Sequence, residues 1–251
     1  MRQLSAAILL FLSAAAFGND TGLDAQAIKT AEDLRDQAMQ GSKAFGIVES
    51  LTTEVGPRIA GSKDYDHATE WAQAKFKALG FDKVWLQPVT FPVWQRRSES
   101  GRIVGPYPQH LVLTALGGSI GTQGPLAAEV VAFDSLEALK AASEGSLKGK
   151  IAFVNLPMQR AKDGSGYGPT STLRRSGASE AAKKGAVAYI MRSAGTDAAR
   201  MPHTGMMRYE EGINKIPAAA LSVPDAGLLA NMLKRGKPVT LELNIDAGFN
   251  G

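Results

Sequence analysis

The sequence of 251 residues has a mass of 26.5 kDa, which is enough for one large domain or two small ones. It carries 28 lysines and arginines against 24 acidic residues, a net charge of +4, and 44% of its residues are hydrophobic, which excludes a wholly disordered, collagen-like or polytopic membrane protein. It has no cysteine, so disulfides, thiolate nucleophiles and cysteine-ligated metals are excluded, and its three histidines are the few candidates for proton transfer or metal binding.

The chain begins with a pattern that is typical of an export signal. A positive charge at Arg2 precedes an apolar run from Ala6 to Ala16, and the small residues that follow end at Gly18. The run is too short to cross about 30 Å of hydrocarbon as a helix. We therefore predict a signal peptide over residues 1–18 and a secreted or periplasmic protein with no membrane contact after cleavage. An uncleaved N-terminal anchor is the alternative.

Two helical regions are predicted next along the chain. Apolar residues recur at spacings of three and four from Leu23 to Leu51, and Gly41 interrupts this pattern. After a loop, Ser62 is placed to cap a further helix, and Gly80 is placed where that helix ends.

The period then changes to two over Val84–Val93, which predicts a strand. Pro88 and Pro92 lack amide hydrogens, so this strand is expected at a sheet edge or with a bulge. Glycine and proline become frequent from about Ser98, and we place a domain boundary near residues 98–108. The predicted regions are 19–98 and 99–246, with 247–251 beginning a further part.

The second region is predicted to be a compact α/β unit of short strands and small helices. Residues 162–172 are rich in glycine and serine and are expected to form a mobile surface loop. Strands are predicted over His110–Leu116, Ala127–Phe133, Ile151–Leu156, Val187–Met191, Ala218–Val223 and Val239–Ile245, and helices over Ser135–Ala142, Gly177–Lys184 and Pro224–Leu233.

The segment Gly117–Gly121 matches the G-x-S-x-G pattern of serine hydrolases around Ser119. That pattern requires a strand before the serine and a helix after it. Gly124 and Pro125 follow too soon for a long helix to begin, so a glycine-rich turn between two strands is the better interpretation. A serine hydrolase acting through Ser119 remains the weaker alternative.

The histidines are too far apart in sequence to give the closely spaced ligand pairs of most zinc sites. His67 falls on the polar side of its helix, and His110 begins a strand. His203 lies in a loop that continues with methionine, arginine and tyrosine, and such a loop can line a cleft. The basic doublets are scattered rather than gathered into one face, so no nucleic-acid partner is expected.

One segment, Leu51–Ser62, resembles the N-terminal signature of the M28 family of zinc peptidases, in its carboxypeptidase Q branch. The resemblance extends from Leu51 to Ile245 because further matching segments keep the same order. These segments are residues 86–89, 119–122, 149–151, 177–182, 202–205 and 215–218.

The resemblance implies an α/β (α+β) fold in which helices and first strands of an M28 peptidase domain precede an inserted, β-rich protease-associated (PA) domain. It implies a secreted exopeptidase, a hydrolase of dipeptides or short peptides with two zinc ions, and a possible homodimer. In that family the zinc ligands and the general base follow the inserted domain, so we expect no catalytic and no metal-binding residue in this chain. His203, Thr204 and Tyr209 are the candidates for substrate-cleft contacts.

Two functions from different classes follow from this resemblance. In the first, the chain is the N-terminal and PA-domain portion of such a peptidase, and it is expected to be inactive by itself because it lacks the di-zinc segment. Alternatively, it is a stand-alone PA-type binding module without catalysis.

Overall fold

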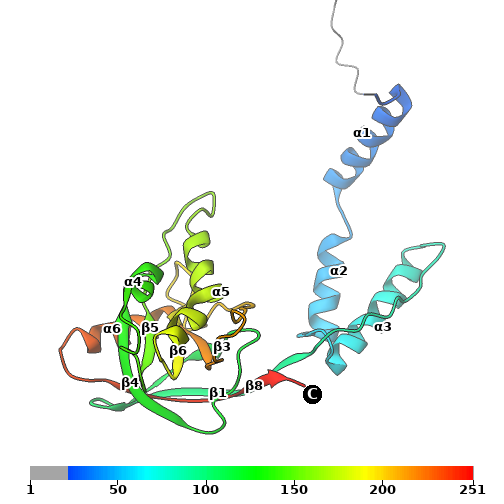
Figure 1. The fold of residues 1–251 in the computed structure, drawn as a ribbon. Helices are drawn as coiled ribbons and strands as arrows, with labels where there is room; N and C mark the ends of the chain where they lie inside the picture. The colour runs from blue at the N-terminus through cyan, green and yellow to red at the C-terminus, as the bar shows by residue number, and fades with distance from the viewer. Residues whose placement is uncertain (1–21, 251) are drawn as a thin grey trace, which may run out of the picture. The chain divides into compact units, whose positions relative to one another are not determined.

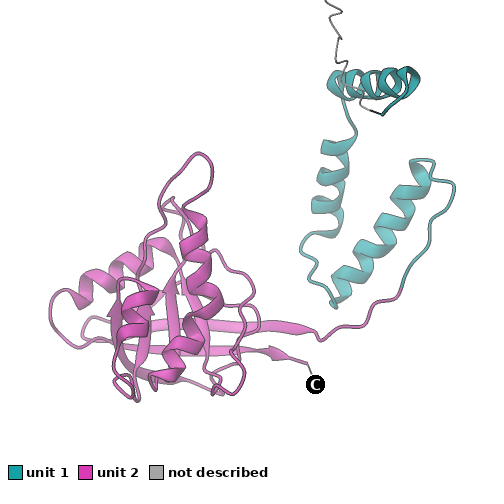
Figure 2. Cartoon of the chain, turned by 45° about the horizontal axis from the view of Figure 1, so that its top comes forward, with its two compact units in different colours: residues 1–87 teal, residues 88–251 magenta. Residues whose placement is uncertain are grey.

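The computed structural model describes residues 22–250, so the predicted signal peptide over residues 1–18 lies outside the described part (Figure 1). The chain divides into two compact units, which we describe separately. Unit 1 ends at Gln87 and unit 2 begins at Pro88 (Figure 2). Within residues 22–250, no helix is both long enough and apolar enough to cross a membrane.

Unit 1 contains the helices that the spacing of apolar residues predicts. Asp24 caps the first helix by accepting from the Ala27 amide at 2.7 Å, and Ser62 accepts from the Tyr65 amide at 3.2 Å. Gly41 separates the first two helices, as predicted. The elements are α1 (Ala25–Gln40), α2 (Ala44–Ser50), the π-helical turn η1 (Leu51–Val55) and α3 (Lys63–Ala78).

No described residue of unit 1 is fully buried, so this unit has no closed hydrophobic core of its own. Large apolar side chains remain exposed on it, among them Trp85 with 68% of its surface accessible. The predicted strand over Val84–Val93 is wrong, because these residues pair with no described strand. Pro88 and Pro92 remove two of the amide hydrogens that a ladder would need.

Limited proteolysis of the full chain is expected to remove unit 1 and to leave unit 2 largely intact. Cleavage requires local unfolding, which costs little free energy where few apolar contacts are buried. Mass spectrometry after brief trypsin treatment would identify a fragment that begins near Pro88. Equal survival of both units would contradict this expectation.

Unit 2 is built on an eight-stranded sheet with the strand order β2-β1-β8-β4-β5-β6-β7-β3. Strands β4 to β7 are parallel neighbours, and the strands on either side of them are antiparallel. The strands are β1 (Trp94–Gly105), β2 (Gln109–Leu111), β3 (Leu113–Ala115), β4 (Leu126–Phe133), β5 (Ile151–Val154), β6 (Ala188–Arg192), β7 (Ala218–Leu221) and β8 (Thr240–Phe249), and the helices are α4 (Leu136–Ala141), α5 (Tyr167–Lys183) and α6 (Val223–Leu233).

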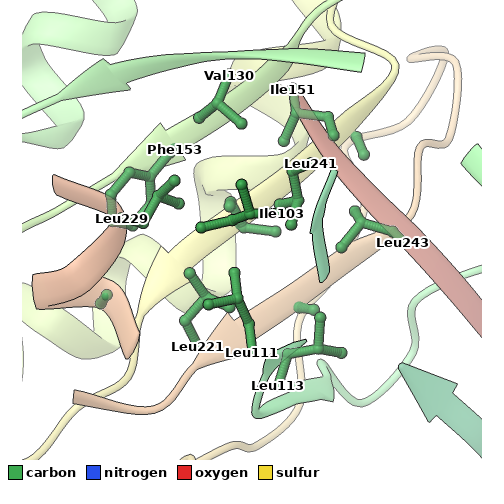
Figure 3. Close-up of a cluster of buried hydrophobic side chains, with 14 of the residues drawn as sticks. Ile103, Leu111, Leu113, Val130, Ile151, Phe153, Leu221, Leu229, Leu241 and Leu243 are labelled. Atoms are coloured by element: carbon green, nitrogen blue, oxygen red, sulfur yellow. The ribbon is translucent and has the colours of Figure 1, made fainter. Parts of the chain in front are cut away.

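The parallel strands β5 and β7 are apolar at every position because helices cover both of their faces. Alternate residues of β5 enter different clusters: Phe153 packs with Leu229 of α6, whereas Val154 packs with Leu173 of α5. Figure 3 shows the first of these clusters, in which Ile103 of β1 lies among side chains from the rest of the sheet.

The sheet curls so that β1 approaches β3 from the opposite end of the strand order. Two side chains of β1 then take the place of ladder hydrogen bonds. Arg96 donates to the Ala115 carbonyl, with Nη2 at 3.1 Å, and the Ala115 amide donates to Glu99 Oε2 at 2.6 Å. The amide and carbonyl of Ala115 are thereby satisfied at the end of the strand order, where β3 lies.

Three predictions for unit 2 need correction. The predicted helix Gly177–Lys184 is the second half of α5, which begins ten residues earlier, and the other strands and helices are confirmed to within a few residues. The region around Ser98 is not a domain boundary but lies inside β1, the longest strand. This strand was not predicted because charged residues interrupt its apolar pattern. The predicted strand His110–Leu116 is two strands, because Val112 donates its amide to Asp225 instead of to a ladder. The predicted loop over residues 162–172 is helical from Tyr167 onward.

The two ends of unit 2 lie together. Trp94, at the start of β1, pairs with Phe249, at the end of β8, and the Asn250 amide donates to the Val93 carbonyl at 2.9 Å. The chain therefore enters and leaves this unit at neighbouring positions of one antiparallel ribbon.

Candidate functional site

His203 lies in the segment between β6 and β7, and two contacts fix it in place. Its amide donates to the buried Ser193 hydroxyl at 2.8 Å, which anchors the backbone to the end of β6. Its Nε2 lies 3.0 Å from the hydroxyl of Tyr167, the first residue of α5, and the two rings are nearly perpendicular with centroids 5.6 Å apart. The ring itself remains exposed.

A third residue completes a polar chain behind this histidine. Arg174 lies two turns along α5, and its Nη1 donates to the Tyr167 oxygen at 2.8 Å. Because guanidinium has donors only, the phenol hydrogen is left for His203 Nε2, which can accept it. The Arg174 Nε is buried without a hydrogen-bond partner in the described part of the chain. The chain Arg174–Tyr167–His203 therefore orients the imidazole.

His203 and Tyr167 line an open hollow of about 510 Å³ on unit 2. Its only acid is Asp197, which accepts the Ala199 amide at 2.8 Å and so helps to shape the loop. A histidine and a phenol that line the same hollow can bind polar groups of a ligand and exchange a proton with them.

The other two predicted contact residues do not join His203 in this hollow. Thr204 turns to Arg96, whose Nη2 donates to its hydroxyl at 3.3 Å. The Tyr209 hydroxyl accepts from the Ile120 amide at 3.1 Å and donates to the Ile216 carbonyl at 2.6 Å. Burial raises the pKa of Tyr209 more than the hydrogen bond from the Ile120 amide lowers it. The role of all three residues in a substrate cleft stays a prediction.

Ser119 is a structural residue of a buried turn. Its hydroxyl accepts from the Ala218 amide at 2.8 Å and donates to the Ile120 carbonyl at 2.9 Å, and only 1% of the residue is exposed. No histidine is bonded to it. The serine-hydrolase interpretation is therefore wrong, because a nucleophile must reach its substrate and hold a base.

The donor groups of the described residues do not fit a zinc site. Within residues 22–250, no three histidine or carboxylate side chains come together. The three histidines belong to separate elements, namely α3, β2 and the loop before β7, and His203 Nε2 is already engaged by Tyr167.

Tyr167 and Arg174 were missed in the sequence because residues 162–172 were predicted to be a loop. Pro169 is the signal that could have placed them, since proline is tolerated in the first turn of a helix, where its missing amide has no partner to lose. Arg96 was missed because its strand was not predicted.

No protein-family model matches the chain. Human carboxypeptidase Q is 36% identical over 208 residues, which are 82% of this chain and 42% of that protein. The crystal structure of a peptidase M28 precursor from Shewanella amazonensis is 53% identical, with a TM-score of 0.83 over 89% of this chain and 51% of that one. The zinc aminopeptidase BSAP from Bacillus subtilis shares the fold at 19% identity, with a TM-score of 0.51 over 82% of this chain and 43% of that one. The chain thus spans about half the length of the proteins it matches.

Proposed function

Since this chain belongs with the carboxypeptidase Q-like peptidases of the M28 family, we propose that it supplies the first helices and an inserted PA-type module of a zinc-dependent exopeptidase. The enzyme hydrolyses dipeptides or short peptides. The observation that carries this proposal is the match to the Shewanella peptidase, at 53% identity over 89% of the chain.

The geometry of unit 2 supports its assignment as an inserted module. Trp94 pairs with Phe249, so the chain leaves unit 2 beside the position where it entered. A unit of this kind can interrupt a host domain without separating the host's own elements. The exposed apolar residues of unit 1 supply surface for such a host domain to cover.

The zinc ions belong to a part of the enzyme that this chain does not span. This view is supported by the length of the matched proteins, about twice that of this chain, and by the zinc named for the Bacillus subtilis aminopeptidase. The chemistry that zinc supplies when bound is activation of water and polarisation of a carbonyl. His203 and Tyr167 would bind and orient the peptide beside that centre. The apolar run from Ala6 to Ala16 supports export to the periplasm or beyond.

The first test is to read the source gene past the codon for residue 251 and to express the whole open reading frame. We expect a longer protein that contains zinc and releases amino acids from dipeptides. A stop codon directly after residue 251, with no hydrolysis by this chain, would overturn the enzyme and favour a stand-alone binding module. Unit 2 has the closed core that such a module requires.

In that longer protein, His203→Ala is expected to lower kcat/KM by about tenfold, the effect of losing one interaction of about 1.4 kcal/mol with the substrate. His110→Ala is the matched control, because this histidine is exposed on β2 outside the hollow and should change nothing. An unchanged kcat/KM in His203→Ala would remove the proposed substrate contact while leaving the peptidase assignment in place.

A further inference from the structure

Unit 2 carries a second hollow, of about 520 Å³, between α5 and the segment Met206–Glu210. We propose that this hollow binds a short acidic peptide segment, by pairing its carboxylates with three cations and by packing an apolar side chain between them. We call it the cationic hollow. Neither His203 nor Tyr167 lines it, so it is separate from the hollow described above.

The cations are Lys140 of α4, Arg175 of α5 and Arg208 of the facing segment, and all three are exposed. The side chains of Lys140 and Arg208 make no hydrogen bond or ion pair with any residue between 22 and 250. Arg175 has one long contact, from Nη2 to the Thr172 hydroxyl at 3.4 Å. Their donors are therefore available to a ligand.

The acidic residues of the same wall do not neutralise these cations. Glu180 and Glu210 both bind Lys183, whose Nζ lies 3.3 Å from one carboxylate and 2.6 Å from the other. The hydrogen bond that Lys183 donates to Glu210 raises the pKa of Lys183, so this ammonium stays charged. The two glutamates and three rim cations leave an excess of positive charge, which favours an anionic ligand.

An apolar surface lies between the cations. Met206 is 60% exposed, and the Tyr209 ring stands beside it. Both positions are fixed: the Met207 amide donates to the Gly117 carbonyl at 2.8 Å, and the Tyr209 hydroxyl is held at Ile120 and Ile216. A prearranged wall of this kind lowers the entropy lost on binding.

The size of the hollow favours a peptide over a simple anion. Its volume of about 520 Å³ is within the range of small-ligand pockets, far above what one carboxylate or phosphate fills. A segment with acidic side chains on either side of an apolar one would place carboxylates at the rim and the apolar group at Met206.

The test is calorimetric titration of the full chain with N-acetylated, C-amidated Glu-Leu-Glu and with its neutral analogue Gln-Leu-Gln. We expect the acidic peptide alone to bind, and to bind more weakly as salt is raised, because the cations are exposed. The double variant Arg175→Gln/Arg208→Gln should lose affinity about tenfold or more, as expected for the loss of two charge-assisted contacts. Arg235→Gln, just beyond the end of α6, removes one positive charge outside the hollow and should bind like the parent chain.

Three results would overturn the proposal: no binding of the acidic peptide, equal binding of the neutral one, or the same loss in Arg235→Gln. Glutarate that binds as tightly as the peptide would also overturn it, since the site would then take simple carboxylates. The titration measures binding and not peptide hydrolysis, so the outcome is independent of the proposed function.

Discussion

Gly177→Ala is expected to lower the free energy of unfolding of unit 2 by about 2 to 3 kcal/mol, against the usual preference of helices for alanine. Gly177 lies inside α5, directly over the ring of Tyr189. A Cβ at this position would lie 2.2 Å from the phenol oxygen and 2.2 Å from the ring carbon that bears it. Tyr189 is fully buried and donates to the Leu173 carbonyl at 3.2 Å, so neither the ring nor its hydroxyl has room to withdraw.

Gly168→Ala is the matched control on the same helix. Apart from its two chain neighbours, no atom lies within 4 Å of the Cβ that it would add. Pro169 follows and disfavours the helical conformation of a residue that carries a Cβ, which offsets the gain in helix propensity. We expect this variant to stay within about 1 kcal/mol of the parent. Urea denaturation of both variants gives the comparison, and a Gly177→Ala variant as stable as Gly168→Ala would contradict the close packing of α5 on β6.

Asp225→Ala is expected to destabilise unit 2 by about 3 kcal/mol at pH 7, because it leaves the buried Ser222 hydroxyl and the Val112 amide without this acceptor and Arg200 without its ion pair. The carboxylate is only 3% exposed. It accepts from the Val112 amide at 2.8 Å, from the Ser222 hydroxyl at 2.7 Å and from Arg200 Nε at 3.0 Å. It thus ties the break between β2 and β3 to the start of α6, which Ser222 caps.

The same carboxylate makes stability depend on pH in a defined direction. Burial by itself raises the pKa of Asp225, but the hydrogen bonds from Arg200, Ser222 and Val112 outweigh it and hold that pKa below its ordinary value. The stabilisation is therefore complete above the unfolded-state pKa of about 4 and is lost as pH falls through the lower folded-state value. The difference in unfolding free energy between the parent and Asp225→Asn should shrink steadily below about pH 4.

Asp246→Asn is the control for this pair of variants. Its partner is Arg97, at 2.8 Å, and both side chains are about half exposed. Removing this surface ion pair should cost at most about 0.5 kcal/mol. A loss in Asp225→Ala no larger than that in Asp246→Asn would show that the buried network does not hold the strands to α6.

The elements that were predicted well from the sequence are those that a local pattern of residue types defines. Strands β5 and β7 are continuous apolar runs because both of their faces are covered, and such runs stand out in any sequence. The end of α3 was equally clear, because Gly80 adopts a φ of 86° that other residues rarely accept.

The failures come from residues whose structural role depends on distant partners. Strand β1 was missed because its sequence is rich in charged residues, which are more typical of a loop. The partners of these residues lie on β3 and β8 and cannot be recognised locally; the residues are Arg96, Arg97, Glu99 and Arg102. The divided strand after His110 follows from Asp225, a residue more than a hundred positions away.

The candidate site was predictable only in part for the same reason. His203 was found because a histidine in a loop is conspicuous, but its orientation depends on Tyr167 and Arg174. Those residues are placed correctly only once α5 is known to begin at Tyr167, and no local pattern shows which face of that helix meets the loop.

Because the two ends of unit 2 lie side by side, this unit could be inserted into a loop of another protein. The paired residues Trp94 and Phe249 stand about 5 Å apart, the spacing of facing residues on adjacent antiparallel strands. Two neighbouring positions in a hairpin of an unrelated carrier protein present the same spacing, so a graft of residues 93–250 would stretch neither backbone. The inserted module would replace a single hairpin loop of the carrier and would keep its surface accessible, including the cationic hollow.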